Sequence, residues 1–158
     1  MESKHHPHDS GRYMWKAILI PTDGSALSQR AVEQGVALAR ALGAAVVGLT
    51  VTMPFHVFAL EPMMVTDTAE RYEEHLRVLT RKYLSVIESA AKEAGVPCLT
   101  LTRSGEHPWQ EIIQAAQEQK CDAICMASHG RRGVSALVLG SETVKVLTHS
   151  RIPVVVVR

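Results

Sequence analysis

The sequence predicts an α/β fold, an open parallel sheet of five strands with helices on both faces. Five short apolar runs rich in β-branched residues alternate with four segments of helical periodicity along the 158 residues. Glycine, proline and small polar residues separate these runs and mark the turns between them. This alternation favours parallel pairing, because parallel neighbours need a crossover connection that is usually a helix.

The first half of the chain contains two strands joined by a helix. Residues 15–21 form an apolar run that ends at a turn, and Ser25 follows as a candidate helix cap. Residues 31–42 then repeat alanine, glycine and leucine at helical spacing, until a glycine stops the helix. A second β-branched run covers residues 45–53 and ends at Pro54.

An irregular apolar stretch, residues 54–66, precedes a long helix. We expect this stretch to cover the core, with a lid over the ligand site and a partner surface as the alternatives. Asp67 and Glu70 resemble a capping box at the start of the helix, and Gly95 ends it. The apolar stripe of this helix is predicted at Leu76, Leu79, Tyr83, Ile87, Ala90 and Ala94.

The second half supplies three further strands. Residues 96–103 alternate between apolar and polar, which predicts an edge or half-covered strand. Residues 121–127 are mostly apolar, so we expect that strand to be covered on both faces, and residues 152–157 form the last strand. Two helices connect these strands, with apolar positions at Trp109, Ile112, Ile113 and Ala116 in the first and at Val144 and Leu147 in the second.

Composition is that of an ordinary globular domain and excludes several classes of protein. Hydrophobic residues make up 46% of the chain and charged residues 21%, and the net charge is +1. No nucleic-acid partner is expected, because the basic residues are spread out rather than gathered on one face. No segment resembles a signal peptide or reaches the length of a membrane span, so we expect no membrane partner and a cytoplasmic location.

The polar N-terminus and the cysteines carry no clear chemistry. Residues 1–13 hold three histidines, and we interpret them as a flexible tail before a single domain at 14–158, since a metal site needs a fixed second shell. Cys98, Cys121 and Cys125 match no zinc or thioredoxin spacing. We expect the last two to be small buried hydrophobes.

Two loops follow the strands at which a doubly wound sheet is expected to bind its ligand. Residues 22–25 follow the first strand, and residues 128–133 follow the fourth. Gly130 and Gly140 lack a Cβ, so their backbone amides could approach anionic oxygens closely, and Ser141 opens a helix whose free N–H groups favour negative charge. The residues alone leave phosphate binding and plain turn or cap roles as equal alternatives.

These loops resemble those of the universal stress protein family. The shared segments are Pro-Thr-Asp-Gly-Ser at 21–25, Met-Ala-Ser-His-Gly at 126–130, Leu-Gly-Ser at 139–141 and the apolar end at 152–157. The resemblance covers residues 14–158 and implies an adenine nucleotide alpha hydrolase-like fold with strand order 3-2-1-4-5. That order sets the first and fourth strands side by side, where the winding of the sheet reverses.

Nucleotide-binding members of that family carry G-x-x-G, nine residues and then G-[ST]. In this chain the second glycine is Gly130, and the final pair is Gly140 with Ser141. Ala127 stands at the first glycine position, where its methyl group departs from the family's pattern. Glu142 places a like charge beside the expected phosphates, at a cost of about 1 kcal/mol at the dielectric of water.

The resemblance implies a role for each part of the site. Asp23 would contact the nucleoside, the backbone of Val51 would bind adenine, and backbone amides of the glycine segment, with that of Glu142, would hold phosphates. His129 would reach a phosphate or serve a local turn, and Arg132 would offset the charge of Glu142 or stay solvated. The expected cofactor-binding residues are Pro21, Thr22, Asp23, Val51, Met126, Ala127, His129, Gly130, Arg132, Gly140, Ser141 and Glu142.

The expected function is a stress-response or signalling module that binds ATP, ADP or AMP, with or without Mg²⁺, and does not turn it over. The segment lacks the lysine of a P-loop, so ordinary phosphoryl-transfer machinery is incomplete. One alternative is a slow ATPase or phosphotransferase with Asp23 or His129 as base. The other is a nucleotide-free interaction protein. The resemblance also implies a homodimer through Val154–Val157, an apolar strand that needs a partner or a cover if it lies at the edge of the sheet.

Overall fold

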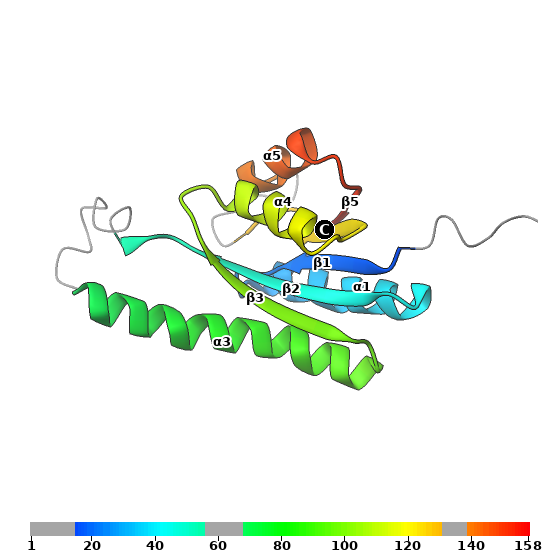
Figure 1. Cartoon of the computed structure of the whole chain (residues 1–158), viewed down its shortest axis with the longest axis horizontal. Helices are drawn as coiled ribbons and strands as arrows, with labels where there is room; N and C mark the ends of the chain where they lie inside the picture. Colours follow the sequence, from blue (N-terminus) through cyan, green and yellow to red (C-terminus); the bar gives the residue numbers. More distant parts are fainter. Residues whose placement is uncertain (1–14, 56–67, 131–138) are drawn as a thin grey trace, which may run out of the picture.

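Five parallel strands form one sheet in the order β3-β2-β1-β4-β5 (Figure 1), which confirms the predicted order. The computed structural model describes residues 15–55, 68–130 and 139–158. The strands are β1 (Ala17–Pro21), β2 (Ala45–Thr52), β3 (Cys98–Ser104), β4 (Ala123–Ala127) and β5 (Val154–Val157). The helices are α1 (Ala26–Leu42), α3 (Ala69–Ala94), α4 (Pro108–Glu118) and α5 (Ser141–His149).

The helices cover both faces of the sheet, as predicted. α1 and α3 pack on one face, where Ile18, Ile20 and Val46 point into the core. α4 and α5 pack on the other face, against Leu19, Leu49 and further strand residues of opposite parity. Strand residues thus alternate between two apolar layers, which is why the central strands are nearly continuous hydrophobic runs.

The predicted cap of α1 is confirmed. Ser25 Oγ accepts a hydrogen bond from Ser28 N at 3.2 Å, and Gly43 ends the helix with a left-handed φ of 66°. Inside the helix, Gly35 allows close packing on the sheet, because a Cβ there would lie 2.6 Å from Cδ1 of Ile20.

α3 differs from its prediction in two details. It begins after Thr68, whose Oγ1 accepts a hydrogen bond from Arg71 N at 3.3 Å, and not after Asp67, which lies outside the described residues. Its buried residues are Tyr72, Thr80, Leu84, Ile87 and Ala91, whereas the other predicted stripe positions are only half-buried. The predicted and observed stripes are adjacent columns of one helix surface, since the helix lies against both α1 and the β2–β3 edge of the sheet.

β3 and β4 behave as their patterns predict. β3 is an edge strand, and Leu99 on it is 49% exposed. β4 lies between β1 and β5, and all five of its residues are buried. β1 and β4 pair in parallel, with Ile18 opposite Ala123 and Leu19 opposite Ile124. The winding of the sheet therefore reverses between these two strands.

α5 turns a different face inward from the one its apolar residues suggest. Val144 and Leu147 are 45% and 41% exposed, while Thr143 and Val146 are buried. Thr143 faces inward because its Oγ1 donates a hydrogen bond to the carbonyl of Ala127 at 3.0 Å. A polar residue thus replaces an apolar one at the point where α5 meets the end of β4.

The cysteines are free, and Cys121 and Cys125 are buried as expected. Burial raises the pKa of each of these two thiols to about 11.

The predicted tail at 1–13 and nearly all of the irregular stretch at 54–66 lie outside the described residues. In the described part of that stretch, the ring of Phe55 lies 5.5 Å from the ring of Tyr72. Within the described part of the chain, no helix is long and apolar enough to cross a membrane.

Candidate functional site

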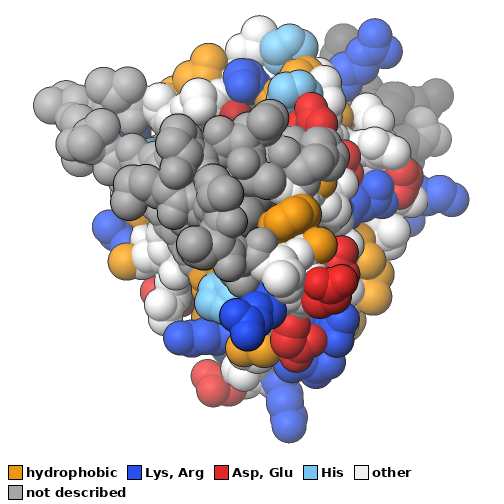
Figure 2. Space-filling model, turned by 90° about the vertical axis from the view of Figure 1, so that its left-hand side faces the viewer, with side chains coloured by type: hydrophobic (Ala, Val, Ile, Leu, Met, Phe, Trp, Pro, Cys, Tyr) orange, Lys and Arg blue, Asp and Glu red, His pale blue; other side chains and the backbone are white. Residues whose placement is uncertain are grey.

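A cavity of about 550 Å³ opens at the carboxyl ends of the strands, where β1 and β4 lie side by side. Its volume is in the range of small-molecule sites. Figure 2 shows this edge of the molecule face on, with histidine and carboxylate side chains close together toward the end that carries α4 and α5. All predicted site residues that the structure describes line this cavity: Pro21, Thr22, Asp23, Val51, Met126, Ala127, His129, Gly130, Gly140, Ser141 and Glu142. Arg132 lies outside the described residues.

The loop after β1 is held by its own short side chains. Thr22 Oγ1 lies 3.1 Å from Ser28 Oγ and accepts a hydrogen bond from Gly24 N at 3.2 Å. Asp23 Oδ1 accepts a hydrogen bond from Ser25 N at 3.0 Å, which is an Asx turn. These bonds fix the carboxylate of Asp23 at the start of α1, on the wall of the cavity.

Gly24 is required in this loop for two reasons. Its φ is +74°, a left-handed conformation that residues with a Cβ seldom adopt. In addition, a Cβ at this position would lie 2.2 Å from Cε1 of Tyr83, on α3. The turn that presents Asp23 therefore rests directly on an aromatic ring of α3.

Backbone hydrogen bonds hold both described ends of the loop after β4 close to the end of that strand. Ser128 N donates to the carbonyl of Val157 at 2.8 Å, and Gly140 N donates to the carbonyl of Ser128 at 2.8 Å. A Cβ on Gly140 would lie 3.1 Å from Cα of His129, so close approach of two backbones favours glycine here. The first turn of α5 is thereby held beside the end of β4.

The two loops meet at Asp23 and Gly130. A Cβ on Gly130 would lie 2.6 Å from Oδ2 of Asp23, a distance that real Cβ atoms do not tolerate. The absence of a side chain at Gly130 lets the carboxylate lie against its backbone. The structure thus brings together the acidic residue and the glycine that the sequence singled out in separate loops.

The side chain of Glu142 points from α5 to the start of α4. Its Oε2 accepts a hydrogen bond from Trp109 N at 2.9 Å, and its Oε1 lies 3.2 Å from Nζ of Lys145. α4 needs this partner because its N-cap residue, His107, forms no side-chain cap bond. Glu142 therefore caps a neighbouring helix, a role that the sequence does not reveal because the two residues lie far apart along the chain.

Ala127 and Val51 form parts of the wall that are set by the sheet itself. Ala127, at the end of β4, is 8% exposed, so its methyl group is nearly enclosed. Val51 lies near the end of β2, opposite Arg103 of β3. A side chain of β2 also holds the β1 loop in the same region, because Thr50 Oγ1 donates to the carbonyl of Thr22 at 3.2 Å.

Sequence reasoning missed the part of the cavity that lies after β3. Glu106, His107, Pro108 and Ile112 line this part, and the other wall residues that were not predicted are Ser28, Leu49, Met53, Thr143 and Lys145. The carboxyl end of β3 lies at the same edge of the sheet, so the rule that selected the other two loops also selects the loop of Glu106 and His107. Lys145 could have been found as the residue one helical turn beyond Ser141.

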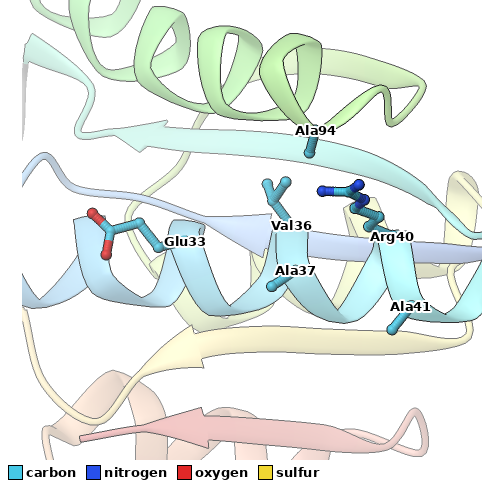
Figure 3. Close-up of a pocket in the computed structure, with 6 residues that line it drawn as sticks. All are labelled: Glu33, Val36, Ala37, Arg40, Ala41 and Ala94. Atoms are coloured by element: carbon cyan, nitrogen blue, oxygen red, sulfur yellow. The ribbon is translucent and has the colours of Figure 1, made fainter.

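The described residues offer no second site of this kind away from the strand ends. A second hollow of about 530 Å³ lies between α1 and the C-terminal end of α3, and Figure 3 shows its lining side chains on the two helices. None of those side chains comes from the end of a strand. Among the described residues, no three His, Cys, Asp or Glu side chains are grouped so that they could hold a metal ion.

The sheet order defines a doubly wound domain of the adenine nucleotide alpha hydrolase-like class, and its cavity lies across the ends of the first and fourth strands. The family model of universal stress proteins matches residues 14–158. The chain belongs to the universal stress protein family.

Relatives in two organisms illustrate this membership. Universal stress protein MJ0531 of Methanocaldococcus jannaschii is 30% identical over 149 residues, which are 94% of this chain and 85% of that protein. A universal stress protein of Thermus aquaticus is 32% identical over 145 residues, which are 92% of this chain and 100% of that protein.

Solved structures share the same fold. Protein MJ0577 of M. jannaschii superimposes with a TM-score of 0.77 at 26% identity, covering 92% of this chain and 96% of its own. A universal stress protein in complex with cAMP gives a TM-score of 0.65 at 22% identity, with coverage of 92% and 98%. The universal stress protein of Archaeoglobus fulgidus in complex with dAMP gives 0.67 at 18% identity, with coverage of 92% and 100%.

Proposed function

We propose that this protein binds an adenine nucleotide in the cavity between β1 and β4 and acts as a stress-response or signalling module. The observation that carries the proposal is the contact of Asp23 with Gly130 beside the first turn of α5, which sets a carboxylate, a bare backbone and a helix N-terminus around one cavity. The cAMP and dAMP complexes of universal stress proteins with the same fold support adenine nucleotides as the ligand class.

Each part of the wall suits one part of a nucleotide. Asp23 would accept hydrogen bonds from ribose hydroxyls, and the backbone of Val51 would pair with the edge of adenine. The phosphate would lie on the amides of Gly130, Gly140–Ser141 and Glu142, because free N–H groups and the dipole of α5 favour an anion there. ATP, ADP and AMP, with or without Mg²⁺, are the candidates within this class.

Binding without turnover is part of the proposal. Lys145 is the one lysine or arginine among the described cavity residues, and its Nζ is paired with Glu142 rather than placed to activate a phosphate. If the protein only binds ATP, phosphate release in the presence of Mg²⁺ stops at or below one equivalent. Continued release that is lost in Asp23→Ala would support a slow ATPase instead.

A test of nucleotide binding compares two aspartates. Calorimetric titration with AMP and ATP is expected to give one site in the wild type and at least about 10-fold weaker binding in Asp23→Ala, because a hydrogen bond to a charged group contributes about 1.5–3 kcal/mol. Asp122→Ala is the matched control: Oδ2 of Asp122 also accepts a backbone N–H, that of Lys16, but just ahead of β4, away from the cavity. Equal affinity in both variants would contradict the assigned role of Asp23.

A second copy of the chain is the proposed partner. β5 is an edge strand of four valines, Val154–Val157, all of them half-buried. An apolar edge strand favours pairing, and pairing with the same strand of another molecule closes a two-fold dimer. A cytoplasmic location belongs to the same proposal.

A further inference from the structure

The backbone of Glu142 belongs to the start of α5, and its side chain reaches the start of α4. Both places affect how much negative charge a bound ligand can carry. Glu142 is the second residue of α5, so its own backbone N–H is one of the free groups at this helix start that would receive a phosphate. Glu142 lines the cavity, and its side chain is 36% exposed. Its Oε2 lies on Trp109 N, at the start of α4.

The start of α4 is a further helix N-terminus that borders this cavity, beside those of α1 and α5, through His107 and Pro108. Free N–H groups there would favour a second anionic group. The N–H of Trp109 is instead bound by Glu142 at 2.9 Å, so the carboxylate of the protein itself fills the place that a further phosphate would use.

The same carboxylate engages the lysine of the site. Nζ of Lys145 lies 3.2 Å from Oε1 of Glu142, and Lys145 is the only lysine or arginine that lines the described part of the cavity. A polyphosphate could recruit this ammonium group only by separating it from Glu142. The N–H of Trp109 and the ammonium group of Lys145 could both bind further phosphates, but both are bound to the Glu142 side chain.

We propose that Glu142 restricts the site to nucleotides that carry a single phosphate group, as a 5′-monophosphate or a cyclic monophosphate. This inference rests on the proposed adenine-nucleotide function and states which members of that class the site accepts. One phosphate is matched by the amides at Gly130 and at the start of α5. Each additional negative charge held near 4 Å from the Glu142 carboxylate lowers affinity by about five-fold, even at the dielectric of water.

The experiment measures the affinities for AMP, cAMP, ADP and ATP by calorimetry, with EDTA present to remove metal ions. In the wild type, metal-free ATP is expected to bind at least about 10-fold more weakly than AMP. The affinities for AMP and cAMP then show whether the site prefers a 5′-monophosphate or a cyclic monophosphate. Added Mg²⁺ neutralises two charges of ATP, so it should narrow the difference between AMP and ATP.

Three variants make the test specific to Glu142. Glu142→Gln removes the charge and keeps an oxygen for Trp109 N, so ATP should come within about 3-fold of AMP. Glu142→Ala frees both Trp109 N and Lys145 and should favour ATP further. Lys145→Gln removes the ion-pair partner of the carboxylate and leaves its bond to Trp109 N, so the preference for AMP should widen.

The control is Glu93→Gln, which removes an exposed glutamate near the C-terminal end of α3, at the opposite edge of the sheet. It is expected to keep the wild-type ratio of the AMP and ATP affinities. An unchanged ratio in Glu142→Gln, or equal metal-free binding of AMP and ATP by the wild type, would overturn the inference while leaving the proposed function intact. Failure of every adenine nucleotide to bind would overturn both.

Discussion

The carboxylate of Asp23 lies against the backbone of Gly130, so closely that a Cβ on Gly130 would be 2.6 Å from Oδ2. This contact joins the loop after β1 to the loop after β4, at the point where the winding of the sheet reverses. Glycine at position 130 leaves the Asp23 carboxylate undisturbed in this place. A residue with any side chain would displace the carboxylate that the proposed nucleoside contact needs.

Gly130→Ala is therefore expected to weaken nucleotide binding by at least about 10-fold, because the added methyl group moves Asp23. The measurement is a calorimetric titration with AMP. Gly43→Ala is the matched control: it places a methyl group in open space at a left-handed φ, so it should cost about 1 kcal/mol of stability and leave binding unchanged. Similar loss of binding in both variants would show that lowered stability, not the Asp23 contact, is responsible.

Gly24→Ala should lower the free energy of unfolding by about 2–4 kcal/mol. The left-handed φ of +74° contributes about 1–2 kcal/mol, and overlap of the new methyl group with the ring of Tyr83 contributes the rest. Urea denaturation measures the loss, again beside Gly43→Ala, which shares the backbone strain without a neighbouring ring. Equal losses of unfolding free energy in the two variants would mean that the Tyr83 ring moves aside without an energetic penalty.

The three thiols should react at very different rates. Cys98 is exposed, whereas Cys121 and Cys125 are buried and their pKa values are raised to about 11. Ellman's reagent at pH 8 is expected to modify Cys98 alone in the native protein and all three cysteines in urea, because the thiolate is the reacting species. Rapid modification of all three without urea would contradict the burial of the other two.

The same burial predicts a loss of stability at alkaline pH. A native pKa of about 11 lies above the unfolded value, so the neutral thiols stabilise the fold fully below the unfolded pKa. That contribution disappears as the pH rises from about 9 toward about 11. Urea midpoints should therefore fall over this range, and the fall should be smaller in Cys121→Ala/Cys125→Ala. An equal fall in the variant would assign it to other groups.

Val156→Lys should convert the proposed dimer into monomer or aggregate. Val156 pairs with Met126 on one side, and none of the strands in the described residues lies on the other side of β5. A charge in the middle of this edge strand disfavours pairing with a second copy. Light scattering after gel filtration measures the mass. A dimer of unchanged mass would contradict the assignment of β5 as the interface.

The strands, the helices and the strand order could be predicted because each depends on a local pattern or on the recognised motifs. The apolar alternation of residues 96–103 predicted an edge strand, and Gly43 and Gly95 marked helix ends that the structure confirms. Pattern reasoning was less accurate about which helix face points inward. On α5 the apolar Val144 and Leu147 are exposed, since the hydrogen bond of Thr143 to Ala127 orients the helix.

The cavity could be located only in part for a similar reason. Its loops after β1 and β4 follow from the topology rule, and the same rule extends to Glu106 and His107. The cap that Glu142 forms on Trp109 N could not be predicted, because it depends on the packing of α5 beside α4. From the sequence, Glu142 is only a like charge beside the expected phosphates. Its orientation toward α4 is the basis of the proposal that it selects among nucleotides.

The most direct test of the proposed function is a calorimetric titration of nucleotide-free protein with AMP. We expect a single saturable site per chain, with affinity reduced at least about 10-fold in Asp23→Ala and in Gly130→Ala and kept in Gly43→Ala. Absence of any saturable heat in the folded wild type, together with failure of AMP to raise its melting temperature, would contradict it.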